Sequence, residues 1–227
     1  DFVQAMNRDL ADRHEGNSEL DGVIESYELA FRMQSAVPQV MDLRSESQET
    51  LDLYGASGGP TGDFGRMCLL ARRFAEAGVR FIELTHEGWD QHSGLRQKLA
   101  ANCRATDQPI AALIKDLKQR GLLDDTLVVW AGEFGRTPMA QGNGRDHHIK
   151  GFSLWMAGGG IQGGISYGAT DELGFHAVDR PTQFYDIHAT LLHLLGMDHE
   201  KLTFPFQGLD QRLTGVEPAH VVKEILC

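Results

Sequence analysis

Cysteine is scarce in this chain, and its few copies are widely separated. Among the 227 residues there are three cysteines, Cys68, Cys103 and Cys227. An odd number at such distant positions excludes a disulfide framework and a zinc site built from thiolates. We therefore expect three thiols that are buried or incidental to function.

Basic residues are also in short supply, and long hydrophobic runs are absent. Lys and Arg number 21 against 32 Asp and Glu, which leaves a formal net charge of -11. Such a chain lacks the basic face that binds phosphate backbones, so its composition argues against nucleic acid as a partner. No run approaches the roughly 18 apolar residues that a bilayer span needs. The hydrophobic content of 41% is typical of a globular domain.

Several common catalytic signatures are missing as well. The sequence contains no Gly-x-Ser-x-Gly elbow, and no serine or threonine is marked as a nucleophile by its neighbours. The glycine strings at 158–160 and 163–164 lack the strand-to-helix context of a phosphate loop, so we interpret them as turns. The chain begins at Asp1 and shows no signal peptide.

Residues 1–60 are predicted to be a helical segment that packs on the main domain and adds no strand to its sheet. Asn17 and Ser18 can cap a helix to about Gln34, which Pro38 should stop, and a second helix is expected at about 45–53. The first helix carries an apolar stripe that should be buried. The stripe consists of Leu20, Val23, Ile24, Tyr27, Ala30 and Phe31.

Residues 61–227 alternate between predicted helices and strands, which indicates one α/β domain. Strands are expected near 79–84, 126–131 and 152–157. Helices are expected at 63–77, at 95–120 with an interruption at Pro109, and at 181–195. Alternation with short links predicts right-handed crossovers and a mainly parallel sheet.

Carboxylates and imidazoles follow these strands at three places, where an α/β sheet usually builds its site. Asp90 and His92 are two residues apart, so in an extended segment both could face one ion. Glu133 lies in a tight glycine turn, and Asp146-His147-His148 follow a glycine-rich loop. Carboxylates and neutral imidazoles are usual ligands of zinc-like metals.

Each motif also has a simpler interpretation. An Asp-x-His pair is common by chance, and the 141–148 loop could be merely mobile. Glu133 could form a surface pair with Arg136, although that guanidinium could equally hold an oxyanion through two hydrogen bonds.

Taken jointly, the motifs resemble the bacterial family called domain of unknown function 1501, over nearly the whole chain. The segments that carry this resemblance are 71–73 (ARR), 89–92 (WDQH), 132–138 (GEFGRTP), 144–147 (GRDH) and 158–164 (GGGIQGG). Segments 123–130 and 185–196 also resemble sulfatase motifs. The resemblance implies a three-layer, alkaline-phosphatase-like (sulfatase-like) α/β fold. It also implies the C-terminal part of a longer, exported or periplasmic chain.

The resemblance implies a metal-dependent hydrolase of phosphate or sulfate esters, acting on a small anionic ester or a sulfated or phosphorylated glycan. The implied metal ligands are Asp90, His92, Glu133 and His147, holding a divalent ion, with zinc preferred over calcium or manganese. Arg136 and Asp146 are the candidate catalytic residues, and Arg136, Arg145 and His148 the candidate substrate-binding residues. Phe134 stands where the superfamily has a ligand. The alternative is therefore a non-catalytic ligand-binding module on a degenerate hydrolase fold.

Overall fold

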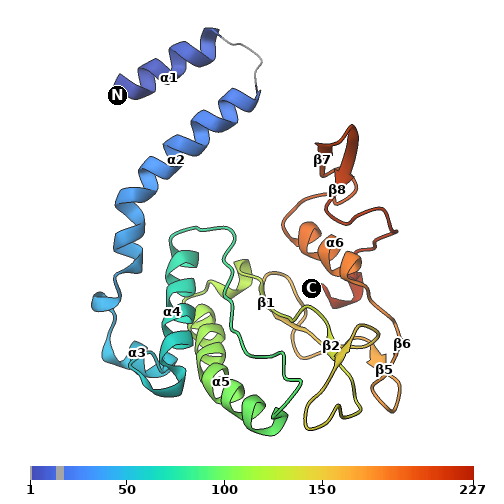
Figure 1. Ribbon diagram of the computed structural model, residues 1–227. Helices are drawn as coiled ribbons and strands as arrows, with labels where there is room; N and C mark the ends of the chain where they lie inside the picture. Colours follow the sequence, from blue (N-terminus) through green and yellow to red (C-terminus); the bar gives the residue numbers. More distant parts are fainter. Residues whose placement is uncertain (1, 14–17) are drawn as a thin grey trace.

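The computed structural model describes residues 2–13 and 18–227 as a mixed α/β fold (Figure 1). Its α-helices are α1 (Phe2–Arg13), α2 (Ser18–Met41), α3 (Gln48–Tyr54), α4 (Gly62–Glu76), α5 (Leu95–Gln119) and α6 (Phe184–Leu194). Its strands are β1 (Val128–Trp130), β2 (Gly135–Arg136), β3 (His147–His148), β4 (Trp155–Ala157), β5 (Ala169–Thr170), β6 (Ala177–Asp179), β7 (Thr203–Phe206) and β8 (Leu209–Arg212). The α/β class predicted from the sequence is confirmed.

The predicted helices are present, but two of them pass through prolines at which we expect a break. α2 continues beyond Pro38 to Met41, and α5 runs through Pro109 without interruption. Proline removes one backbone donor and crowds the preceding turn. In α5 this loss is offset because Pro109 is buried in the core. The predicted Asn17 cap of α2 lies outside the described residues.

The expectation of a mainly parallel sheet is wrong. β1 pairs with β4 in antiparallel register, with Val129 opposite Met156. The remaining pairs, β2–β3, β5–β6 and β7–β8, are antiparallel as well. A parallel pair needs a crossover, usually a helix. Residues 131–154 contain only the β2–β3 ribbon and loops, so the chain returns beside β1 in the opposite direction.

The strand predicted at 79–84 does not form within the described structure. The segment carries no strand assignment, yet its side chains alternate between exposed and half-buried from Phe81 to His86. Leu84 packs against the core, whereas Phe81 is 81% exposed. The period-2 pattern is therefore real, but no neighbouring strand pairs with it.

The hydrophobic core lies where α3, α4 and α5 meet, and it extends to Val128 and Trp130 of β1. Its buried members are Tyr54, Ala56, Phe64, Cys68, Leu69, Ala112, Leu113 and Leu117. Full burial of a leucine side chain stabilises a fold by roughly 1.5–3 kcal/mol. The motifs that surround the candidate site are attached to this core through β1 and α4.

A buried ion network runs alongside the core, with Arg72 of α4 at its centre. The guanidinium lies 2.5 Å from Glu76, 2.8 Å from Glu46 and 3.2 Å from Asp116 of α5. The Nε and Nη2 atoms of Arg72 form no hydrogen bonds, so their contacts with Asp116 and Glu46 are ion pairs alone. Tyr54 of α3 donates to Asp116 at 3.0 Å. The network therefore joins α3, α4, α5 and the turn before α3.

The network also lowers the pKa of one of its acidic members, Glu46. Burial raises the pKa of Glu46, but the nearby Arg73 and Arg72 guanidinium groups outweigh that effect and leave the pKa below its ordinary value. Because the folded-state pKa is lowered, the stability that Glu46 contributes is complete above its ordinary pKa. It is lost as the pH falls through the lowered value.

α1 and α2 form an arm that extends from the body of the molecule (Figure 1). The C-terminal end of α2 is held by Arg73, which donates to the carbonyl oxygens of Val40 (2.6 Å) and Gln39 (3.0 Å). Two members of the predicted apolar stripe do not pack on the α/β part. Tyr27 and Phe31 are each 74% exposed. Among the described residues, no helix has both the length and the hydrophobicity that a membrane span requires.

Arg72→Ala should lower the free energy of unfolding by about 3–5 kcal/mol, because it leaves buried carboxylates without their cation. The measurement is urea denaturation followed by circular dichroism. The matched control is Arg44→Ala, which removes an ion pair whose arginine side chain is 90% exposed and should change little. Equal losses in the two variants would contradict a special role for Arg72.

Candidate metal centre

Aromatic contacts hold the segment that carries Asp90 and His92. Phe64 of α4 meets the His86 ring at 5.1 Å, and Trp89 meets Trp130 of β1 at 5.8 Å. Trp89 Nε1 donates to His86 Nδ1 at 3.0 Å. These contacts hold residues 86–89 between α4 and β1, directly before the candidate ligands Asp90 and His92.

The 141–146 loop packs directly onto this segment, backbone against backbone. A Cβ atom on Gly144 would lie 2.1 Å from the His92 carbonyl carbon and 2.5 Å from the Gln91 oxygen. The Arg145 amide donates to the same Gln91 oxygen at 3.1 Å. Asn143 accepts from the amide of Gly94 through its side chain at 3.0 Å. Only glycine at position 144 permits this approach.

The β2–β3 ribbon sets the remaining side chains. Arg136 is opposite His147, and Gly135 is opposite His148. Directly opposed residues point to the same side of an antiparallel pair, and neighbours along a strand point to opposite sides. Arg136 and His147 therefore share a side, and His148 turns away from it.

Asp90, His92 and His147 converge and form what we call the His–Asp cluster. Asp90 Oδ1 lies 2.9 Å from His147 Nε2 and 3.0 Å from His92 Nε2. The two imidazole Nε2 atoms are 3.0 Å apart. Within the described residues, these three form the one group of carboxylate, imidazole or thiol side chains whose geometry could hold a metal ion.

Glu133, the fourth predicted ligand, reaches the cluster only through Arg136. The guanidinium donates to Asp90 Oδ1 at 2.6 Å and to Glu133 Oε1 at 3.2 Å. Hydrogen bonds from His147 and Arg136 lower the pKa of the Asp90 carboxyl to about 2. Asp90 is therefore an anion at any pH well above that value. Arg136 lies beside the cluster, where its guanidinium would contact a second anion that binds there.

Hydrogen bonds behind the cluster orient its imidazoles. His92 Nδ1 lies 3.0 Å from Gln141 Oε1, and an amide oxygen can only accept, so Nδ1 carries the proton. Asp146 accepts from the His147 amide at 2.8 Å and lies near the Gln141 amide group at 3.4 Å. The Phe134 ring packs 4.5 Å from the His147 ring. The sequence analysis did not identify Gln141, because no local motif marks a glutamine whose partner, His92, is 49 residues away in the chain.

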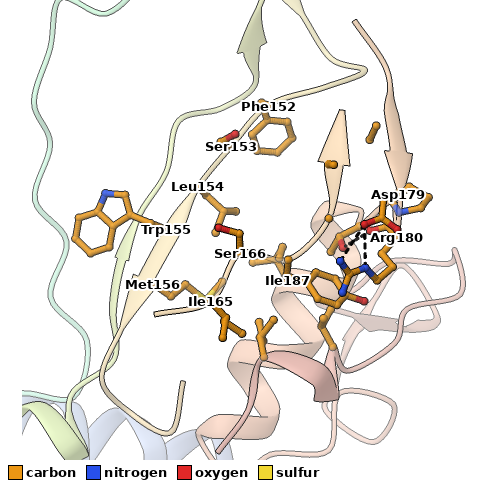
Figure 2. A pocket seen from close by; sticks show the side chains of 18 of the residues that line it. Phe152, Ser153, Leu154, Trp155, Met156, Ile165, Ser166, Asp179, Arg180 and Ile187 are labelled. Carbon is orange, nitrogen blue, oxygen red and sulfur yellow. Dashed lines mark hydrogen bonds and ion pairs between the residues drawn. The ribbon is translucent and has the colours of Figure 1, made fainter. Parts of the chain in front are cut away.

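Two predicted substrate-binding residues lie apart from the cluster. His148 is buried, and its Nε2 is 2.5 Å from the Phe175 carbonyl oxygen, where it donates. Arg145 contributes its backbone amide, and its half-buried side chain makes no ion pair with the described residues. A separate hollow of about 620 Å³ lies between β4, β5–β6 and α6, and Figure 2 shows the Asp179–Arg180 pair on its wall. It is lined by none of the cluster residues.

The donor chemistry of the cluster suits a cation. The Nε2 atom of His92 faces the Asp90 carboxylate oxygen at 3.0 Å, and its Nδ1 atom lies against Gln141 Oε1. A proton or a metal ion between Nε2 and the carboxylate oxygen would make this contact favourable. Ligands of tetrahedral zinc, at about 2.0–2.2 Å from the ion, are roughly 3.4 Å from one another. The observed separations of 2.9–3.0 Å are shorter than this spacing by about 0.4–0.5 Å, so the three side chains would move slightly apart around an ion.

The molecule is therefore a mixed α/β protein with a carboxylate–imidazole cluster beside an arginine. The sequence matches the family described as a protein of unknown function (DUF1501) over residues 1–226, and the chain belongs to that family. No curated protein matches it. No solved structure matches it either.

Gly144→Ala should separate the two loops and destabilise the protein by about 1–3 kcal/mol, as overpacking does. Hydrogen exchange at the Arg145 amide, which is bonded to Gln91, should accelerate in the variant. Gly163→Ala is the matched control, since a Cβ there meets nothing within 4 Å. Unchanged exchange at Arg145 would show that the close approach at Gly144 does not hold the loops together.

Proposed function

We propose that this chain binds one divalent metal ion through Asp90, His92 and His147 and hydrolyses phosphate or sulfate esters. Zinc is the preferred ion, with manganese or calcium as alternatives. The observation that carries the proposal is the convergence of three ligand atoms within 3.0 Å of one another. Three protein ligands leave a fourth position for water or substrate, as catalytic zinc sites do.

A bound ion would polarise the ester oxygen and lower the pKa of a coordinated water. The chain itself supplies the other functions. Arg136 holds the anionic group of the ester, because its guanidinium matches phosphate and sulfate oxygens. Glu133 and Asp90 keep that guanidinium in place. Gln141 holds the His92 imidazole through its Nδ1 atom, and Asp146 accepts from the backbone amide of His147.

We further propose that the fold is the three-layer, alkaline-phosphatase-like arrangement and, from the family resemblance, that the protein is exported. The sulfatase-like motifs at 123–130 and 185–196 support the fold assignment. The antiparallel β1–β4 pair would then be one part of a larger sheet. The Glu133 turn follows β1 directly, as expected of a strand whose carboxyl end carries site residues.

The rival function is binding without turnover, and two features favour it. Glu133 is bound to Arg136 and is not a member of the three-atom group. Phe134 packs on His147 and cannot ligate. We therefore expect metal binding to be easier to detect than hydrolysis.

His147→Ala should abolish the binding of zinc at one ion per chain, because two remaining ligands cannot close the site. Isothermal titration calorimetry and the metal-dependent rise in melting temperature measure this, since a ligand of the native state stabilises it. The control is His176→Ala, whose imidazole pairs with Asp171. Binding should also weaken on acidification, because imidazoles ligate only when neutral. Asp90, with its pKa lowered to about 2, stays ionised throughout. Equal zinc binding by parent and His147→Ala would refute the proposed site.

Arg136→Ala should keep zinc binding but lose at least about 100-fold in the hydrolysis of aryl phosphates or sulfates, since an oriented charge contact at the reacting group is worth this much. The assay compares parent and variant with added zinc, manganese or calcium. We expect slow turnover by the parent. A parent that binds zinc and inorganic phosphate but turns over neither ester would favour the rival, binding-only function.

A further inference from the structure

Asp146 lies behind the His–Asp cluster and is not one of its three members. The sequence motif predicts a catalytic residue at this position, yet both carboxylate oxygens already face other groups of the chain. Oδ1 accepts from the His147 amide at 2.8 Å, and Oδ2 lies 3.4 Å from the side-chain amide nitrogen of Gln141. These contacts indicate a role in positioning the cluster.

Backbone hydrogen bonds hold Asp146 and Gln141 in place relative to His92. The Asp146 amide donates to Thr137 Oγ1 at 3.2 Å, and its carbonyl oxygen accepts from the Thr137 amide at 2.9 Å. Gln141 and Gly144 close a turn through two backbone hydrogen bonds of 3.1 Å and 2.9 Å. Gly144 in turn packs against the His92 carbonyl group. The carboxylate and the base of the glutamine side chain are therefore fixed beside the imidazole.

The side-chain amide of Gln141 has two chemically different ends, and one orientation satisfies both of its neighbours. An ionised carboxylate can only accept hydrogen bonds, so the NH₂ end faces Asp146. The oxygen end then faces His92 Nδ1 at 3.0 Å. Because Gln141 is exposed, water could satisfy either end of its amide. The carboxylate is the group that disfavours the turned amide.

This orientation decides which nitrogen of a neutral His92 carries the proton. The amide oxygen needs a donor, so the proton lies on Nδ1. Asp146 Oδ1 is 3.8 Å from the same nitrogen, and its charge favours the same tautomer. Nε2 is left with the lone pair, and it faces Asp90 Oδ1 and His147 Nε2, each at 3.0 Å. The atom that can ligate a cation thus points into the cluster.

We propose that Asp146 is a positioning residue that sets the tautomer of His92 through Gln141. We call this chain of contacts, from Asp146 through Gln141 to His92, the tautomer relay. Its functional consequence rests on the proposed function, because the lone pair that it directs into the cluster is the one that would ligate the metal ion. Groups that hold a ligating histidine from behind are typically worth about 10–100-fold in metal affinity.

Nitrogen-15 NMR of the histidine side chains in the metal-free chain tests the relay without any ion. At a pH above the titration of the His92 imidazole, the parent should show this residue with its proton on Nδ1. Gln141→Leu removes the acceptor, and Asp146→Asn introduces an amide that can donate or accept, so that Gln141 can turn. Both variants should show a substantial fraction of His92 with its proton on Nε2. The matched control is Gln119→Leu at the exposed end of α5, which should leave the tautomer unchanged.

A double variant tests the relay by restoring it with the charge at the other position. Gln141→Glu combined with Asp146→Asn places a group that can only accept beside His92. The new amide can donate to the new carboxylate, while its oxygen can still accept from the His147 amide. His92 should therefore return to the tautomer with its proton on Nδ1. A merely structural role for the two residues predicts no such recovery.

Zinc titration calorimetry of the same variants separates the relay from the proposed function. Gln141→Leu and Asp146→Asn should each bind zinc about 10–100-fold more weakly than the parent, and the double variant more tightly than either. A parent that shows the Nδ1 tautomer but binds no zinc would refute the metal site and leave the relay intact. A parent with the His92 proton on Nε2, or an unchanged tautomer in either single variant, would overturn the relay. Equal zinc affinity in the parent and both single variants would overturn its role in ligation.

Discussion

The ion pairs of the buried Arg72 guanidinium are the contacts on which the rest of the structure depends. They tie α4 to α5, to Tyr54 of α3 through Asp116, and to the turn before α3 through Glu46. A buried charge of this kind is costly unless every partner is in place, so it permits one arrangement of the three helices. α4 then presents Phe64 to His86, and through Trp89 the same contact reaches the segment that carries Asp90. Through these contacts Arg72 is linked to the segment that carries one member of the cluster, Asp90.

The second constraint is the contact between two backbones at Gly144. It brings the 141–146 loop against His92, so that Gln141 contacts the His92 imidazole while Asp146 accepts from the backbone amide of His147. The β2–β3 ribbon adds Arg136 beside His147. The cluster is assembled from two chain segments, residues 90–92 and the β2–β3 ribbon, and the 141–146 loop joins them through the backbone contact at Gly144.

Two surfaces of the molecule differ in what they offer. The cluster gathers anionic and neutral donors under a guanidinium, which suits a cation and an anionic ester together. The arm exposes large apolar side chains, among them Tyr27 and Phe31 of α2.

The sequence by itself determined the α/β class, the approximate helix positions and the placement of Asp90 and His92 in one short segment. These follow from hydrophobic period and from the chemistry of side chains close together in the chain. Tertiary structure decided the rest. The strands pair in antiparallel register because no crossover helix separates β1 from β4, and segment 79–84 has a strand's alternation but no partner. Glu133 pairs with Arg136. His148 turns to the Phe175 carbonyl, because neighbours along a strand face opposite sides and the ribbon register places His147 on the side of Asp90. Gln141 became part of the site only because a glycine allowed two distant loops to touch.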